Sequence, residues 1–97
     1  MIDEIRATEI AKSRLSQMST SAESDQCVIT NIRRESFGWV FSFNSKRYID
    51  TGDSAYRLYG NLPLVVMRDT GEVRRLPIPV WNPDLDVAID RFRESLQ

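Results

Sequence analysis

The chain has 97 residues, of which 41% are hydrophobic and 28% are charged, and its formal net charge is −1. This length fits one core, so we expect residues 1–97 to form a single domain. Histidine is absent and Cys27 is the one cysteine, which excludes an internal disulfide, a multi-cysteine metal site and the commonest general base. We therefore expect no cofactor and no metal site.

Neither apolar runs nor charge point to a membrane or to nucleic acid. No apolar run approaches the ~20 residues of a membrane span, and the first residues lack the basic and apolar regions of a signal peptide. Residues 26–81 carry eight basic and five acidic side chains, an excess too small to indicate a nucleic-acid-binding surface. We expect a cytoplasmic protein that binds neither membrane nor nucleic acid.

The N-terminal segment is predicted to be a helix. Over residues 3–18, apolar side chains recur at three- and four-residue spacing and draw one stripe, with charged residues on the remaining surface. Residues 19–26 are small and polar without a period, which is typical of a loop.

Two or three strands are predicted next. Residues 27–34 alternate with β-branched side chains on both faces, which favours a strand. Residues 33–36 are predicted to form the turn that leads to a second strand, with Gly38 at a bulge or at a close approach of the backbone. A tight turn then leads to a short third strand at residues 47–49.

The second of these strands, residues 37–44, is aromatic and is the strongest local signal in the chain. Trp39, Phe41 and Phe43 share one face. We expect that face to pack against one or both helices, because each buried aromatic contributes on the order of 1.5–3 kcal/mol. A side chain committed to the core cannot also meet a partner, so a functional surface is expected on the opposite face or edge of the sheet, or after Leu76.

A short helix and a hairpin are predicted in the second half. Asp53 or Ser54 offers a cap for one or two helical turns over residues 55–59, ending at Gly60.

The hairpin combines an apolar strand at residues 64–67 with a loop at 68–72 that places Gly71 where positive φ is needed. In the returning strand at residues 73–76, Arg74 points to the opposite face from its neighbours in sequence.

The C-terminal part is predicted to leave the sheet and form a helix. Pro77 and Pro79 should end the strand or confine it to a sheet edge. Asn82 is predicted to cap a helix whose first position is Pro83, and apolar residues over 85–96 follow helical spacing. The order of elements predicts an α+β fold: an antiparallel sheet of four to five strands packed against an N-terminal and a C-terminal helix.

No catalytic pattern emerges. Asp3, Glu4, Asp84 and Asp86 stand at predicted helix starts, where carboxylates favour the helix dipole. The serines lack a base, and the four glycines lie in separate turns, so no glycine-rich phosphate loop is present. We expect a protein that is not an enzyme.

Three basic doublets and one tryptophan leave two interpretations open. The doublets, Arg33-Arg34, Lys46-Arg47 and Arg74-Arg75, are either solvated charges that protect strand edges or a basic patch for an acidic partner protein. Trp81 either closes an edge of the core or forms part of an interface.

Several motifs, taken in order, resemble the immunity protein 35 family of bacterial polymorphic-toxin systems. They are Phe37-Gly38-Trp39-Val40-Phe41, Asn44-Ser45-Lys46-Arg47-Tyr48, Thr51-Gly52-Asp53, Gly60-Asn61-Leu62-Pro63-Leu64-Val65-Val66 and Thr70-Gly71-Glu72-Val73. The resemblance covers roughly residues 5–76. Residues 77–97, a proline-rich link and a capped helix, diverge from it.

The resemblance implies an antitoxin: a non-enzymatic immunity protein that binds and neutralises a cognate bacterial toxin, such as one with a peptidase domain. Its partner would be that toxin, and a homodimer through an edge strand is also compatible with the sequence. We place the protein-binding site at Arg74, Arg75 and Trp81. The alternative is a chaperone-like holdase, which would display a large apolar patch.

Overall fold

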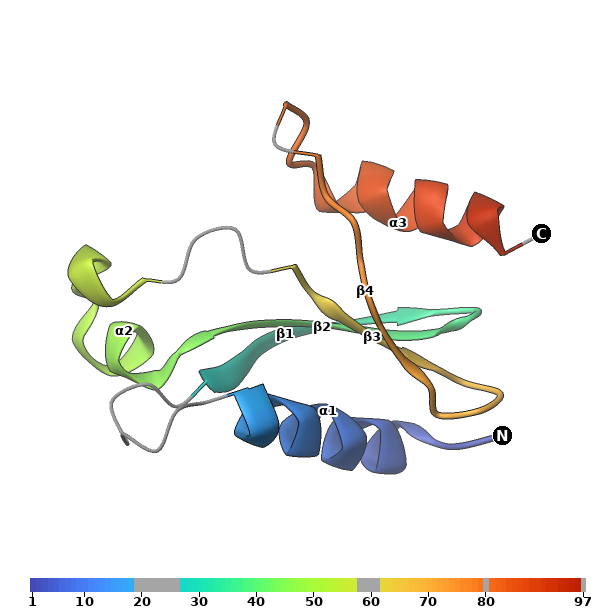
Figure 1. The fold of residues 1–97 in the computed structure, drawn as a ribbon, viewed down its shortest axis with the longest axis horizontal. Coiled ribbons are helices and arrows are strands. Elements are labelled where there is room, and N and C mark those ends of the chain that lie inside the picture. Colours follow the sequence, from blue (N-terminus) through green and yellow to red (C-terminus); the bar gives the residue numbers. More distant parts are fainter. Residues whose placement is uncertain (19–26, 58–61, 80, 97) are drawn as a thin grey trace.

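The fold is a four-stranded antiparallel sheet with one long helix on each face (Figure 1). The computed structural model describes residues 1–18, 27–57, 62–79 and 81–96. The elements are α1 (Glu4–Met18), β1 (Cys27–Glu35), β2 (Gly38–Ser45), α2 (Lys46–Thr51), the 3₁₀ turn η2 (Ser54–Tyr56), β3 (Leu64–Met67), β4 (Val73–Arg75) and α3 (Leu85–Ser95). The strands lie in the order β1-β2-β3-β4, so β1 and β4 are the edges. The predicted α+β class and antiparallel sheet are confirmed, with four strands.

The aromatic face of β2 packs against α1, as predicted. Trp39, Phe41 and Phe43 are all buried and share one cluster with Leu64 and Val66 of β3. The side chains that α1 buries there are Ala7, Ala11 and Leu15. Two of these are alanines, which have little side-chain bulk, so large aromatics fill the space between helix and sheet.

The other face of the sheet is covered by α3. Val40 and Val65 are fully buried there beneath Ile89 and Phe92, and Leu76 joins the same cluster. The expectation that this face would be available to a partner is therefore wrong where α3 lies. Arg74 and Arg75 on the edge strand β4, and Pro77 and Trp81 after it, are exposed.

The β1–β2 hairpin turns later and more tightly than predicted. Arg33 and Arg34 belong to β1, which runs through Glu35, and Glu35 pairs with Gly38 across a two-residue connection. Gly38, at φ 150°, approaches β3 so closely that a Cβ would collide with the carbonyl oxygen of Val66. The predicted close approach at Gly38 is confirmed, whereas the bulge lies in β1 between residues 29 and 31.

The predicted third strand at residues 47–49 is wrong, because these residues form α2. The Ser45 hydroxyl accepts from the backbone N–H of Tyr48 (3.1 Å) and so caps the helix. Gly52 ends the helix in the left-handed conformation, at φ 71°. A capping serine and a terminating glycine thus override the strand preference of Tyr48 and Ile49.

Two further helix boundaries differ from the prediction. Asp53 does cap a turn, but η2 is a single 3₁₀ turn that stops at Tyr56, and Gly60 lies outside the described residues. The cap of α3 is Asp84, not Asn82, because the Asp84 side chain accepts from the N–H groups of Asp86 (2.9 Å) and Val87 (3.4 Å). The predicted loop at residues 19–26 also lies outside the described residues.

Candidate functional site

The β3–β4 hairpin positions the arginine doublet that the sequence singled out. Val65 lies opposite Arg74 and Leu64 lies opposite Arg75. Since paired residues share a face of the sheet, Arg74 is on the α3 side and Arg75 is on the α1 side. The hairpin loop has Gly71 at φ 75°, as predicted. The doublet is therefore divided between both sides of the same exposed edge.

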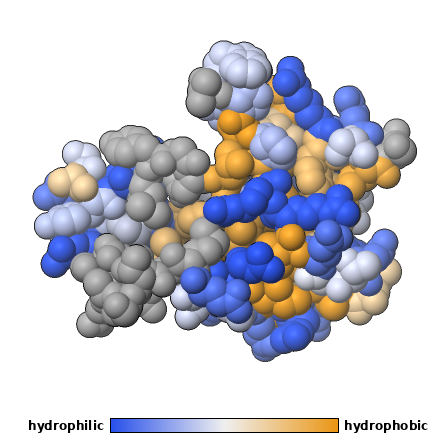
Figure 2. Space-filling view, in the orientation of Figure 1, coloured by the Kyte–Doolittle hydropathy of each residue, from blue (hydrophilic) through white to orange (hydrophobic). Residues whose placement is uncertain are grey.

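A cavity of about 220 Å³ lies beside this edge. Its lining residues are Arg14 of α1, Leu64 of β3 and the three residues of β4, Val73, Arg74 and Arg75. Leu64 is buried and Val73 is half-buried, whereas the three arginines are exposed. The cavity therefore has an apolar floor with cationic side chains around it, and we call it the β4-edge cavity. Figure 2 shows hydrophilic side chains lying across a largely apolar surface on the face of the molecule where β4 runs.

Of the three arginines, one has a single exposed ion pair and one has no ion pair with the described residues. Arg74 pairs with Glu72 on its own hairpin (3.1 Å), and both side chains are about half exposed. The Arg14 side chain makes no hydrogen bond and no ion pair with the described residues. Exposed pairs such as Arg74–Glu72 contribute roughly 0–1 kcal/mol, so the side chains can exchange partners readily.

The third arginine, Arg75, has a structural task. Its Nη1 donates to the carbonyl oxygen of Leu62 (2.9 Å), and its guanidinium carbon lies 5.6 Å from the ring centre of Phe43. These contacts tie the segment before β3 to the edge of the α1-side core. Replacing Arg75 would therefore disturb the fold as well as the surface.

Guanidinium groups around an apolar floor suit the recognition of carboxylates. Arginine presents a planar fork of donors that can bind a carboxylate through two hydrogen bonds. The residues described contain no group of three or more His, Cys, Asp or Glu side chains that could hold a metal ion. The arrangement can bind an acidic group of a partner.

Trp81, the third predicted site residue, stands apart from the arginines. It lies in the link between β4 and α3, and 80% of its side chain is exposed. The interpretation that it closes an edge of the core is therefore wrong. No hydrogen bond, ion pair or ring contact between the described residues joins Trp81 to Arg74 or Arg75.

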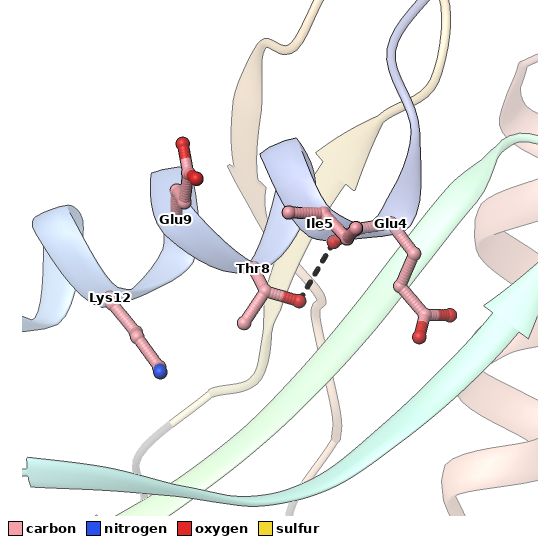
Figure 3. A pocket seen from close by; sticks show the side chains of 5 residues that line it. All are labelled: Glu4, Ile5, Thr8, Glu9 and Lys12. Carbon is pink, nitrogen blue, oxygen red and sulfur yellow. Dashed lines mark hydrogen bonds between the residues drawn. The ribbon is translucent and has the colours of Figure 1, made fainter.

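A second cavity, of about 260 Å³, lies along the outer side of α1 (Figure 3). Glu4 turns toward β1, where it pairs with Arg34, while Glu9 points away from it and pairs with Arg6. The Thr8 hydroxyl donates to the Glu4 carbonyl oxygen (2.8 Å). The Glu4 and Glu9 carboxylates and the Thr8 hydroxyl of this cavity are thus engaged with neighbouring groups and do not converge on one point.

Comparison with known proteins identifies the family. The family described as immunity protein 35 matches residues 6–90, a span that includes the whole sheet and part of α3. The chain belongs to this family. The uncharacterized protein YrhB of Escherichia coli (strain K12) is 45% identical over 69 residues, which is 67% of this chain and 73% of the relative. No solved structure matches the chain.

Membership of the immunity protein 35 family agrees with the resemblance seen in the ordered motifs. The family match continues past Leu76 through the proline-rich link and as far as Asp90 in α3. Among the helices described, none has the length and apolarity that crossing a membrane requires.

The Arg33-Arg34 doublet differs from Arg74-Arg75 because its side chains form ion pairs that link α1 and α3 to the sheet. Arg33 donates to Asp86 of α3 (2.6 Å), and Arg34 pairs with Glu4 of α1. Glu35 also pairs with Arg93 of α3. The hydrogen bond with Asp86 raises the pKa of the Arg33 guanidinium above its ordinary value, and the charges of nearby carboxylates act in the same direction.

Sequence reasoning found Arg74 and Arg75 but missed Arg14. Arg14 reaches the β4-edge cavity because α1 crosses the sheet beneath the β3–β4 hairpin, where a Cβ on Gly71 would stand 3.3 Å from Ile10 of α1. Helical periodicity assigns Arg14 to an exposed face, but it carries no signal for the strand that this face lies beside.

Proposed function

We propose that the protein binds and neutralises a cognate bacterial toxin as a non-enzymatic immunity protein of the cytoplasm. The observation that carries the proposal is the family match over residues 6–90. A toxin with a peptidase domain is the candidate partner that the family resemblance suggests.

The interface in this proposal is the β4 edge together with the link that follows it. Arg14 supplies positive charge that has no ion pair with the described residues, and Arg74 supplies positive charge that is held only by an exposed pair with Glu72. Trp81 supplies a large exposed aromatic side chain. Charges at an interface rim accelerate association and select the partner, while a tryptophan that becomes buried contributes to affinity. An acidic surface of the toxin, with an apolar recess for Trp81, would complement this region.

Co-expression with the toxin encoded beside this gene tests the proposal. The expected result is that the protein restores growth to cells expressing the toxin and elutes with it as one complex. A toxin from an unrelated system serves as the control and should be unaffected. No rescue together with no complex would refute the proposed function.

Charge reversal tests the position of the interface. The Arg14→Glu, Arg74→Glu double variant should weaken toxin binding by at least roughly tenfold and reduce its salt dependence. Arg75 is left unchanged because it holds Leu62 and covers Phe43. Arg91→Glu on α3 reverses one charge at an exposed residue away from the cavity and should leave binding unchanged. Equal affinity for all three proteins would exclude the β4 edge.

The alternative, a chaperone-like holdase, needs one large apolar surface. The exposed large apolar side chains belong to separate elements: Met1, Ile5, Ile49, Tyr56, Trp81 and Leu96. On the face where β4 runs, hydrophilic side chains cross the apolar surface, so it is not one uninterrupted apolar patch (Figure 2). Suppression of aggregation of a heated client protein at stoichiometric ratios, in the absence of any toxin, would favour the holdase.

A further inference from the structure

We propose that β4 binds an acidic, extended segment of the toxin by strand addition, so that the partner segment becomes a fifth strand at the edge of the sheet. The inference rests on the proposed function, which it deepens by naming the kind of segment bound. Its basis is the geometry of the β4 backbone and the distribution of charge around it.

The backbone of β4 has its unpaired groups at the outer edge. Met67 donates to the carbonyl oxygen of Glu72 (2.9 Å), and Leu76 donates to that of Pro63 (2.9 Å). Because antiparallel pairs alternate between bonded and non-bonded positions, Arg74 also directs its N–H and C=O groups toward β3.

Val73 and Arg75, at the alternate positions, direct their N–H and C=O groups outward, away from β3. Within the described residues no strand pairs with this outer edge, and in Figure 1 β4 runs at the front of the sheet with no other described element across it. These two residues offer a partner segment two donors and two acceptors.

The side chains around β4 select for negative charge. In a fifth strand, alternate side chains would lie on the α1 side and the α3 side of the sheet. A carboxylate on the α1 side meets Arg14, and one on the α3 side meets Arg74, while an apolar side chain fits the floor formed by Leu64 and Val73. An extended segment that combines acidic and β-branched residues therefore matches both the backbone and the charges of the edge.

The same charges disfavour a second copy of this chain as the occupant. If two β4 strands paired antiparallel through these outward groups, centred on Arg74, the two Arg74 side chains would lie opposite each other, and like charges in cross-strand positions are destabilising.

The other edge, β1, is less suited to an acidic segment. It is interrupted by the bulge between Ile29 and Asn31, and Arg33 and Arg34 are already paired with carboxylates of α3 and α1. Charge complementarity therefore assigns an acidic segment to β4.

Amide hydrogen exchange measured by NMR tests the inference with the full-length protein and a catalytically inactive form of the neighbouring toxin. On binding, the amides of Val73 and Arg75 should exchange at least about tenfold more slowly. The amide of Arg74, which already faces β3, is the internal control and should change little. If the toxin binds while Val73 and Arg75 exchange as before, or if protection appears along β1 instead, strand addition at β4 is wrong and the proposed function still stands.

If the toxin does not bind, so that the proposed function fails, a peptide-binding experiment tests separately whether β4 accepts an acidic strand. The probe is a six-residue peptide of alternating valine and glutamate with blocked ends. Its binding, with slowed exchange at Val73 and Arg75, would support an edge that takes acidic strands. The same peptide with lysine in place of glutamate should not bind. Failure of the acidic peptide to bind would then overturn the inference.

Proline substitution separates backbone pairing from charge. Val73→Pro removes an outward N–H at the first residue of β4, a position that tolerates proline on an edge strand, and should weaken binding roughly five- to tenfold. Val73→Ala keeps the N–H and loses only the side chain, so it is the matched control. Equal binding by the two variants, with circular dichroism showing both to be folded, would argue against a hydrogen bond from Val73 to the partner.

Discussion

Replacing Phe92 by alanine tests whether α3 is an integral layer of the fold. The Phe92 side chain is 8% exposed, and its ring centre lies 5.0 Å from that of Phe37 at an interplanar angle of 55°. It belongs to the cluster that buries Val40 and Val65 on the sheet face opposite α1. Phe92→Ala therefore removes the largest apolar side chain that α3 buries against the sheet.

The expected loss of stability is about 3 kcal/mol. Truncation of a buried phenylalanine costs roughly 3–5 kcal/mol, and the tilted pair with Phe37 contributes on the order of 0.5–1.5 kcal/mol of such a loss. We expect the lower end of the range because Phe37 is only half-buried, so water can reach part of the space. A domain of this size would then melt on the order of 10–20 °C lower.

Urea unfolding measured in two ways provides the assay. Fluorescence includes the signal of Trp39, which is buried on the α1 side, and far-ultraviolet circular dichroism reports on all helices. The two transitions should coincide in Phe92→Ala as in the parent protein, since a cooperative domain unfolds as one unit. Leu96→Ala, at a 36% exposed side chain beyond the last turn of α3, should change the free energy of unfolding by less than about 0.5 kcal/mol.

A loss below about 1 kcal/mol for Phe92→Ala would refute this reasoning. So would a separate early transition seen by circular dichroism alone, because α3 would then unfold without the sheet.

Three further substitutions follow from single contacts and can be measured in the same unfolding assay. Gly38→Ala should cost on the order of 2 kcal/mol or more, since a Cβ at φ 150° would collide with the Val66 carbonyl oxygen; an unchanged midpoint would show that the backbone shifts there without strain. Ser45→Ala should cost about 1–2 kcal/mol through loss of the α2 cap on Tyr48, and Ser45→Thr should recover part of that loss. Trp81→Ala should stay within about 0.5 kcal/mol of the parent because the side chain is 80% exposed, so a larger loss would mean that Trp81 packs against the fold.

The sequence predicted the sheet well because its strands carry local signals, such as β-branched side chains in β1, alternation in β2 and an apolar run in β3. β2 reads as alternating aromatic and small side chains, and β3 and β4 are joined by a loop whose Gly71 has the positive φ that its position requires. Both long helices were found from apolar spacing. The errors fell on short elements, where a capping contact outweighs local propensity: Ser45 turned a predicted strand into α2, and Asp84 moved the start of α3.

The candidate site could be predicted only in part, since periodicity is local and the site is not. Alternation placed Arg74 and Arg75 on opposite faces of β4, and this is confirmed. Arg14 comes from a helix about sixty positions earlier in the chain, so its place beside β4 depends on how α1 crosses the sheet. The sequence also did not indicate that α3 would cover Val40 and Val65. Of the predicted positions for the functional surface, the sheet face opposite α1 is therefore occupied where α3 lies, and the edge of β4 is kept.

The doublets Arg33-Arg34 and Arg74-Arg75 both lie on strands, but their positive charges differ in whether the fold pairs them with carboxylates of the helices. Arg33 and Arg34 point to opposite faces, and each meets a carboxylate on the helix that covers its face, so their charges are compensated within the fold. Arg74 and Arg75 also point to opposite faces, but no helix carboxylate among the described residues pairs with either. With Arg14 close by, the β4 edge keeps positive charge that no helix carboxylate among the described residues compensates. In the proposed function the protein must meet a toxin before the toxin acts, and positive charge would speed that association. For this reason we propose the interface at this edge.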